Sequence, residues 1–447
     1  MTFHLAMLLL SFLTLYTVGL GASHTSGSEC KSTLSVAKRI VERLQSNYDQ
    51  TPVFGYKGGQ LWTDANALED VHNYMLFANS KEFDNLAGTS ELGVLAFLNL
   101  DWDIVLDGSY DDAQWLILAY WKVADYKNAH NEVSQDYLDA ALAIYDLVAS
   151  QWDTSNCGGG VWWSKDHTYK NAITNELFIL TSAEGYKRYG NQTMLDNAIK
   201  AWSWLEGSGM RNAQGLYNDG IDFIFCHNNN ETTWTYNQGV IASALGALFA
   251  ATGNTTLLSE AEITLDAAIS HLTIVSNATD ATATNSTILK ESCDDAVHST
   301  CNLDQQIFKG IWTKHLMYYL DSANDTSRAQ KYAPFIGSQA IAVADFAMNN
   351  DSDVGNVWRG SERLLEWGTR KAFADRPAVW PVSHIGFINI SRREGKADES
   401  ATLGDIRHCV DVTDRFLIIC GTSGRATMHL VICPDDDDTI FFYNRTE

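Results

Sequence analysis

The chain has 447 residues and a formal net charge of −24, from 55 acidic and 31 basic residues. Such a surface repels nucleic acids and anionic lipids, so the composition argues against both and favours a neutral or cationic partner. Hydrophobic residues make up 45% and charged residues 19% of the chain, which excludes a disordered protein. The length allows one large domain or two to three ordinary ones.

The N-terminal segment has the pattern of a secretory signal peptide. Residues 5–20 form an apolar run, which the small residues Gly21, Ala22 and Ser23 follow. This run is short for a membrane span, and no later apolar stretch reaches about 18 residues. We therefore predict a signal peptide over residues 1–22, no transmembrane span, and a secreted protein at the cell surface or in the cell wall.

Sequons and cysteines agree with export. Nine Asn-x-Ser/Thr sequons indicate a glycosylated surface, and they begin at Asn191, Asn230, Asn254, Asn277, Asn285, Asn324, Asn350, Asn389 and Asn444. None of the eight cysteines has a Cys-x-x-Cys metal spacing, so we expect disulfides, with no metal and no cofactor. The pairing stays open, although Cys293 and Cys301 are close enough in the chain to pair locally.

From residue 34 to about residue 360 the apolar periodicity is mostly helical. Helices are predicted at residues 34–47, 66–78, 89–100, 110–127, 135–151, 172–189, 193–206, 236–251, 257–275, 304–321 and 330–347. No proline lies between Pro52 and Pro334, which suits helices because proline breaks them. The succession of helices and Gly- or Asn-rich turns predicts a closed ring of helical hairpins, with an α-solenoid as the alternative.

The pattern changes after about residue 374. Pro377, Pro381 and the β-prone runs at residues 415–420 and 428–433 replace the helical periodicity. We therefore predict three parts, which are the signal peptide, a helical domain over residues 23–374, and a C-terminal extension of uncertain fold over residues 375–447.

Two adjacent carboxylates, Asp111 and Asp112, begin the helical run at residues 110–121. Two like charges this close raise at least one pKa. A carboxylate beside a carboxylic acid is the arrangement that glycosidic bond cleavage requires. The structural alternative is a helix start, in which Ser109 is the N-cap and the acids complement the helix dipole.

Five later segments carry aromatic, amide and glycine residues in a fixed order, at residues 158–164, 169–176, 216–220, 235–239 and 308–312. Together with the acid pair, this succession resembles glycoside hydrolase family 76, the endo-α-1,6-mannanases, and in particular its fungal cell-wall branch. That branch is associated with GPI-anchored mannoproteins. The resemblance covers about residues 34–360 and implies an (α/α)6 barrel with the acid pair at the mouth of the central groove.

The resemblance also implies a retaining mechanism, with Asp111 as nucleophile and Asp112 as acid/base. The geometry permits it, because consecutive Cα atoms lie about 3.8 Å apart. Retaining carboxyl groups lie about 5–5.5 Å apart, whereas the inverting separation of about 6.5–9.5 Å is harder for neighbours to reach. We expect a monomer that hydrolyses or transfers α-1,6-linked mannose chains.

Further residues in these segments are predicted to bind the sugar through stacking rings or paired amide donors and acceptors. They are Tyr110, Gln114, Trp115, Trp162, Trp163, Asn171, Asn175, Tyr236, Asn237, Gln238 and Lys309. The structural alternatives are a core tryptophan, a helix cap or a surface lysine.

Two other functions stay open. A non-catalytic mannan-binding wall protein would keep the aromatic residues without needing the acid pair. An unsaturated-uronide hydrolase of the same barrel type would need cationic residues to meet substrate carboxylates, which this acidic chain fits poorly.

Overall fold

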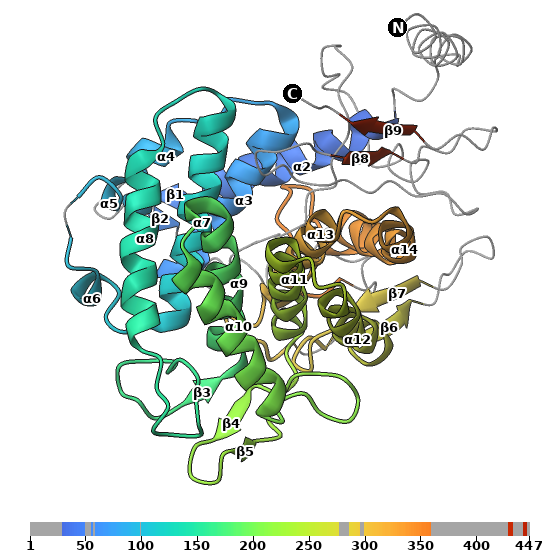
Figure 1. Ribbon diagram of the computed structural model, residues 1–447. Coiled ribbons are helices and arrows are strands. Elements are labelled where there is room, and N and C mark those ends of the chain that lie inside the picture. The colour runs from blue at the N-terminus through green and yellow to red at the C-terminus, as the bar shows by residue number, and fades with distance from the viewer. Residues whose placement is uncertain are drawn as a thin grey trace, which may run out of the picture.

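The computed structural model describes residues 29–49, 55–56, 59–98, 100–276, 286–295, 299–358, 428–431 and 441–444. Helices dominate these residues, which confirms the predicted fold class at this level (Figure 1). The predicted signal peptide and most of the C-terminal extension lie outside the described residues. In the extension, strands β8 (Met428–Val431) and β9 (Phe441–Asn444) pair in antiparallel register.

Five long helices form an inner layer. They are α3 (Leu61–Ala78), α7 (Tyr110–Ala129), α9 (Ala172–Tyr189), α11 (Thr235–Thr252) and α13 (Phe308–Ala323). Each packs against the next in this order, and Lys314 of α13 reaches back to α3 through an ion pair with Glu69, Nζ to Oε2 2.6 Å. The described inner helices therefore close into a ring. The count of six hairpins stays a prediction.

The inner helices are buried on every side. In α11, each residue from Asn237 to Leu248 is buried, as expected for a helix at the centre of a large domain. Gly239 and Gly246 allow α13 to approach closely, because a Cβ atom at Gly239 would lie 2.6 Å from the Cα of Trp312. Small residues on α11 thus set the tight packing of this pair.

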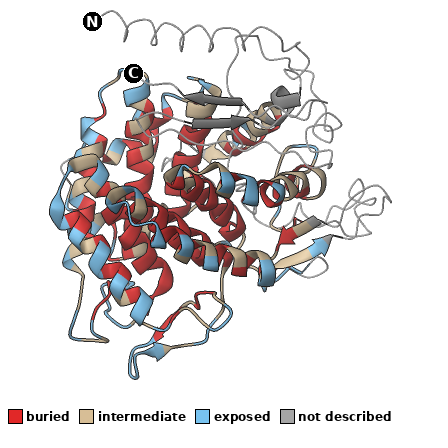
Figure 2. Ribbon diagram, turned by 45° about the vertical axis from the view of Figure 1, so that its right-hand side comes forward, coloured by how far each residue is buried: buried red, intermediate tan, exposed pale blue. Residues whose placement is uncertain are grey.

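A second set of helices covers the inner layer from outside. They are α2 (Glu29–Ser46), α8 (Gln135–Ser150), α10 (Gln192–Gly207), α12 (Thr256–His271) and α14 (Thr326–Ala342), which continues into a π-helical turn, η1 (Val343–Ala347). Helix α8 packs on α7, α10 on α9 and α12 on α11. Buried residues concentrate on the central helices, while the outer helices show exposed faces (Figure 2).

The prediction of a helix over residues 89–100 is wrong. The structure has three short helices here, α4 (Leu86–Thr89), α5 (Glu91–Leu95) and α6 (Trp102–Val105). Ser90 ends α4 and caps α5, since its Oγ accepts a hydrogen bond from Gly93 N at 3.0 Å. Asp101 caps α6 in the same way. These caps interrupt an apolar pattern that resembles one continuous helix.

Other predicted boundaries shift by a few residues. Helix α12 ends at His271, and residues 273–276 instead form strand β6, which pairs with β7 (Ser286–Leu289). Helix α3 begins five residues earlier than predicted, at Leu61, and α13 begins four residues later, at Phe308. Strands β1 (Tyr48–Asp49) and β2 (Gly55–Tyr56) form a separate antiparallel pair.

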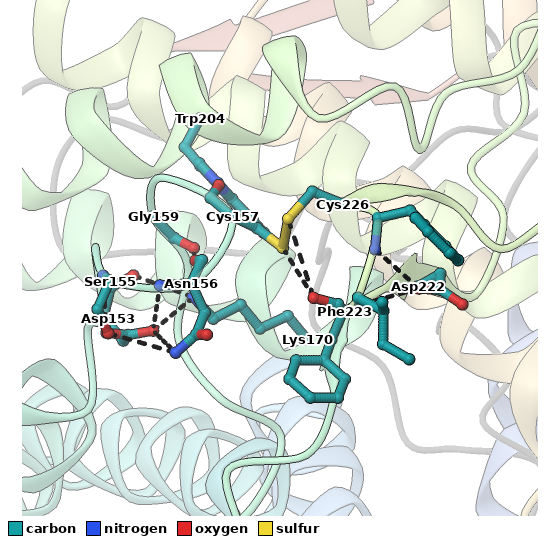
Figure 3. Close-up of a disulfide and its surroundings, with 12 residues drawn as sticks. Asp153, Ser155, Asn156, Cys157, Gly159, Lys170, Trp204, Asp222, Phe223 and Cys226 are labelled. Atoms are coloured by element: carbon teal, nitrogen blue, oxygen red, sulfur yellow. Dashed lines mark hydrogen bonds and ion pairs between the residues drawn. A yellow bond between two sulfur atoms is a disulfide. The ribbon is translucent and has the colours of Figure 1, made fainter.

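A three-stranded antiparallel sheet lies where α9 begins. Its strands are β3 (Lys170–Asn171), β4 (Gly220–Asp222) and β5 (His227–Asn228), in the order β3-β4-β5. The fully buried ammonium of Lys170 donates to the carbonyl oxygens of Asp153, Asn156 and Gly159 at 2.6–3.0 Å (Figure 3). This lysine therefore shapes the Gly-rich loop that precedes β3.

The described residues contain two disulfides, as expected from the cysteine pattern. Cys293 pairs locally with Cys301, and Cys157 pairs with Cys226 across 69 residues. The second bond ties the Gly-rich loop to the turn between β4 and β5 (Figure 3). Within the described ranges, no helix is both long enough and apolar enough to span a membrane.

Replacing Cys157 and Cys226 by serine is expected to lower the free energy of unfolding by about 2–5 kcal/mol, because the disulfide restricts a long loop in the unfolded chain. Urea unfolding followed by circular dichroism measures this loss. The matched control replaces Cys293 and Cys301, whose disulfide closes a loop of only 8 residues. Removing this bond should lower the free energy of unfolding by about 2 kcal/mol less, because a short loop has less entropy to restrict. Equal losses for the two pairs would contradict the loop-length argument.

Candidate active site

Asp111 and Asp112 occupy the first turn of α7, and both are partly exposed. Three groups donate to Asp111. Ser109 Oγ and Asp112 N reach its Oδ1 at 3.1 Å, and Trp163 Nε1 reaches its Oδ2 at 3.0 Å. Ser109 occupies the N-cap position of α7 with both acids in the first turn, as the helix-start alternative had it, but its side chain makes no capping bond. Its hydroxyl instead fixes a carboxylate.

The two carboxyl groups differ in what surrounds them. Burial raises the pKa of Asp111 to about 6, and the hydrogen bonds from Trp163, the backbone and Ser109 limit this rise. Burial also raises the pKa of Asp112 well above its usual range, and the negative charge of Asp111 adds to the rise. Asp111 is therefore the group stabilised as a carboxylate, and Asp112 is the group that holds its proton.

Aromatic side chains connect the starts of the other inner helices around this pair. Phe308, at the start of α13, stacks on Tyr236, at the start of α11, with 3.9 Å between ring centroids. Trp62, at the start of α3, lies 6.5 Å from Phe308 and donates from Nε1 to Asp304 at 3.2 Å. The charge of Asp304 acts in turn on Asp112. The inner helices α3, α7, α11 and α13 thus begin on the same side of the ring.

The sheet beside α9 completes the surroundings. The hydroxyl of Tyr169 donates to Asp219 Oδ2 at 2.5 Å, and Asn229 Nδ2 donates to that hydroxyl at 3.0 Å. Burial raises the pKa of Tyr236, and the negative charges of Asp219 and Asp111 add to the rise. The phenol of Tyr236 therefore lies near both Asp111 and Asp219.

A family model, glycosyl hydrolase family 76, matches residues 31–375. The chain belongs to this family. Among its curated relatives, the mannan endo-1,6-α-mannosidase of Candida glabrata is 27% identical over 249 residues, which cover 53% of this chain and 52% of that protein. The chain spans about half the length of the curated relatives it matches.

Solved structures share the fold. The Dfg5 protein of Chaetomium thermophilum, in complex with glucosamine, superposes with a TM-score of 0.63 at 16% identity, over 74% of this chain and 84% of that one. An inactive variant of the α-1,6-mannanase GH76A of Salegentibacter sp., in complex with α-1,6-mannotriose, superposes with a TM-score of 0.57 at 18% identity. That match covers 73% of this chain and 92% of the mannanase.

Two of the predicted sugar-binding residues of this family 76 chain lie at the acid pair and are accessible. Trp163 is 42% exposed and holds Asp111 through its indole N–H. Tyr236 is partly exposed and stacks on Phe308. These two side chains stay in the candidate site.

The predicted amide ligands hold protein loops. Asn175 is buried, accepts from Val161 N at 2.8 Å and donates to Val161 O at 3.1 Å. Gln238 makes the same pair of bonds to the backbone of Tyr217 at 2.8 and 2.9 Å. We therefore withdraw both from the sugar contacts, because their hydrogen-bonding groups are used in fixing the loops at residues 158–164 and 216–220.

Two further predicted amides have structural roles. Asn171 caps α9 by accepting from Thr174 N at 3.2 Å, as the structural alternative had it. Gln114 is buried and donates to the carbonyl oxygens of Tyr110 and Thr174 at 3.0 and 2.9 Å. Asn237 differs from these, because neither of its buried amide atoms has a hydrogen-bond partner among the described residues.

The remaining predicted residues are buried. Tyr110, Trp115 and Trp162 are each at most 3% exposed, so the core alternative holds for Trp162, and Tyr110 and Trp115 are core residues as well. Lys309 is also buried, where its ammonium bonds Asp294 and the carbonyl oxygen of Asn356. The surface alternative for Lys309 is wrong, and these partners also remove it from the proposed sugar contacts.

Several residues near the acid pair were missed. Tyr169, Asp219 and Phe308 lie inside the segments that the sequence singled out, so the order of those segments was an available signal. Trp62 and Asp304 lie outside them, and no spacing in the sequence connects either residue to Asp112. Within the described residues, no group of three or more histidine, cysteine or acidic side chains is arranged to hold a metal ion.

Proposed function

We propose that the protein is a retaining glycosidase acting on α-1,6-linked mannose chains. One observation carries the proposal: a carboxylate fixed by three donors, Asp111, adjoins a second carboxyl, Asp112, that burial and the charge of Asp111 keep protonated. The names of the curated relatives and the mannotriose bound in the Salegentibacter structure support this choice of substrate.

Asp111 attacks the anomeric carbon as the glycosidic bond breaks, and Asp112 gives its proton to the departing oxygen. A glycosyl ester of Asp111 results. Asp112, now a carboxylate, takes a proton from water or from a sugar hydroxyl, which attacks the same carbon and releases Asp111. Water gives hydrolysis, and a sugar hydroxyl gives transglycosylation.

Incubation with α-1,6-mannobiose and α-1,6-mannotetraose tests the proposal. Shorter products show hydrolysis, and longer products beside them show transfer. Binding of mannotetraose without turnover over long incubation would instead favour a non-catalytic mannan-binding wall protein.

The proposal extends to the protein as a whole. We propose an (α/α)6 barrel over residues 23–374, secretion through the segment 1–22, and a monomer that works at the cell surface or in the cell wall. The family match over residues 31–375 supports the position of the domain boundary before the C-terminal extension.

Activity is expected to follow a bell-shaped dependence on pH. The value of kcat/KM should fall as the pH drops below about 6, where Asp111 takes up a proton, because the nucleophile must be ionised. It should fall again at higher pH, where Asp112 loses its proton and the leaving oxygen is no longer protonated. Initial rates on mannotetraose from about pH 4 to about pH 9 measure both limbs. A flat profile would contradict both assignments.

A further inference from the structure

Glu176 is a buried acid of α9 that no step above uses. It has no exposed surface, and neither carboxyl oxygen has a hydrogen-bond partner among the described residues. Burial raises its pKa well above the usual range, and the negative charge of Asp219 adds to the rise. The side chain is therefore a neutral carboxylic acid, with one O–H donor and one acceptor unused. Such a group costs stability, so its presence needs a reason.

The backbone places Glu176 within one helical turn of the contact between α9 and the segment that carries Asp219. Asp219 O accepts from Ala172 N at 2.7 Å, one helical turn before Glu176 on α9. Two residues earlier, Tyr217 is fixed to Gln238 of α11. The segment 217–219 therefore bridges the starts of α9 and α11. The hydroxyl of Tyr217 is buried there, also without a partner in the described part of the chain.

Charge couplings give the same neighbourhood. Tyr217 and Tyr236 each lie close enough to Glu176 for an electrostatic coupling, and Tyr236 is also coupled to Asp219 and Asp111. Tyr236 and Asp219 are partly exposed, whereas Glu176 is not. Glu176 is therefore the fully buried member of a group of neighbours that includes Tyr236 and Asp219.

We propose that Glu176 is a positioning residue of the mannoside site, which acts through Tyr236 and Asp219 on the sugar beside Asp111. The inference rests on the proposed function. When a sugar hydroxyl bonds Tyr236 or Asp219, the buried acid supplies a second hydrogen bond that fixes the orientation of that group. The carboxyl group of Glu176 thus gains its hydrogen-bond partners in the sugar complex. Hydrogen bonds in an active site often reach full strength only when substrate is bound.

Two substitutions separate this role from a structural one. Glu176→Leu removes the hydrogen-bonding groups and keeps an apolar volume, so the melting temperature is expected to stay or rise. Its KM for mannotetraose is expected to rise roughly tenfold, as when one binding interaction is lost. Glu176→Gln keeps a neutral donor and acceptor and should hold KM within about threefold of the wild type.

Thr264→Val is the matched control. Thr264 of α12 is also buried, and its hydroxyl also lacks a partner among the described residues, but it lies on the outer layer. This variant should change stability without changing KM. A loss of folded enzyme lowers kcat and leaves KM unchanged, so KM reports on positioning alone.

An unchanged KM in Glu176→Leu would overturn the inference. So would a lower melting temperature in both Glu176→Leu and Glu176→Gln. If the wild type binds mannotetraose without turning it over, the dissociation constant from calorimetry replaces KM in the same comparison. The proposed catalysis then fails while the positioning role is still tested. A wild type that neither binds nor cleaves mannotetraose overturns both.

Discussion

Replacing Asp111 or Asp112 by asparagine is expected to abolish turnover of α-1,6-mannotetraose while the fold and sugar binding survive. Loss of the proton donor alone should lower kcat by at least about 10²-fold. Loss of the nucleophile should cost more, because no glycosyl ester forms. Product analysis by chromatography measures turnover, and calorimetry with mannotetraose confirms that each variant still binds.

Asp136→Asn is the matched control for the acid pair, because Asp136 is an exposed acid in the first turn of the outer helix α8. It should keep full activity. On a mannoside whose leaving group needs no proton, azide should restore turnover in the Asp112 variant with retention at the anomeric carbon, because it attacks the glycosyl ester without needing a base. Near-wild-type rates in both acid-pair variants would remove Asp111 and Asp112 from the reaction.

Replacing Lys314 by methionine is expected to lower the free energy of unfolding by about 3–5 kcal/mol. Its ammonium lies 2.6 Å from Glu69 Oε2, 3.1 Å from Asp70 Oδ1 and 2.8 Å from Asn66 Oδ1, and all of these side chains are buried. The substitution leaves two buried carboxylates beside each other without that cation. Urea unfolding measures the loss.

Lys331→Met provides the comparison for Lys314. Lys331 pairs with Asp266 at 2.8 Å, but its side chain is 41% exposed, so this ion pair is worth at most about 1 kcal/mol. If the two variants lose equal stability, the α3–α13 contact does not depend on the buried charge.

The long helices could be predicted from the sequence because their apolar periodicity continues over several turns. The prediction over residues 89–100 was wrong because Ser90 and Asp101 each start a new short helix within a similar apolar pattern. A cap depends on which backbone N–H its oxygen reaches, and apolar spacing carries no information on that contact.

The candidate site could be predicted only in part for a related reason. Asp111 and Asp112 are neighbours in the chain, so their mutual repulsion follows from the sequence alone. Asn175 and Gln238 have donors and acceptors that suit a sugar and a backbone equally well. The structure shows that Val161 and Tyr217 already occupy them. Contacts that join distant segments, such as that of Trp62 with Asp304, left no local pattern.

The closure of the ring through Lys314 constrains the order in which the helices can pack while the chain is being synthesised. The cation is 245 residues away from Glu69, so ribosomal synthesis delivers α3 long before the ammonium that neutralises it. Burying an acid ahead of its cation is costly, so α3 cannot take its final place early. We therefore expect an N-terminal fragment ending before α13 to stay loosely packed. The ring then assembles in one late cooperative step, at the slow rate typical of contacts between distant parts of a chain.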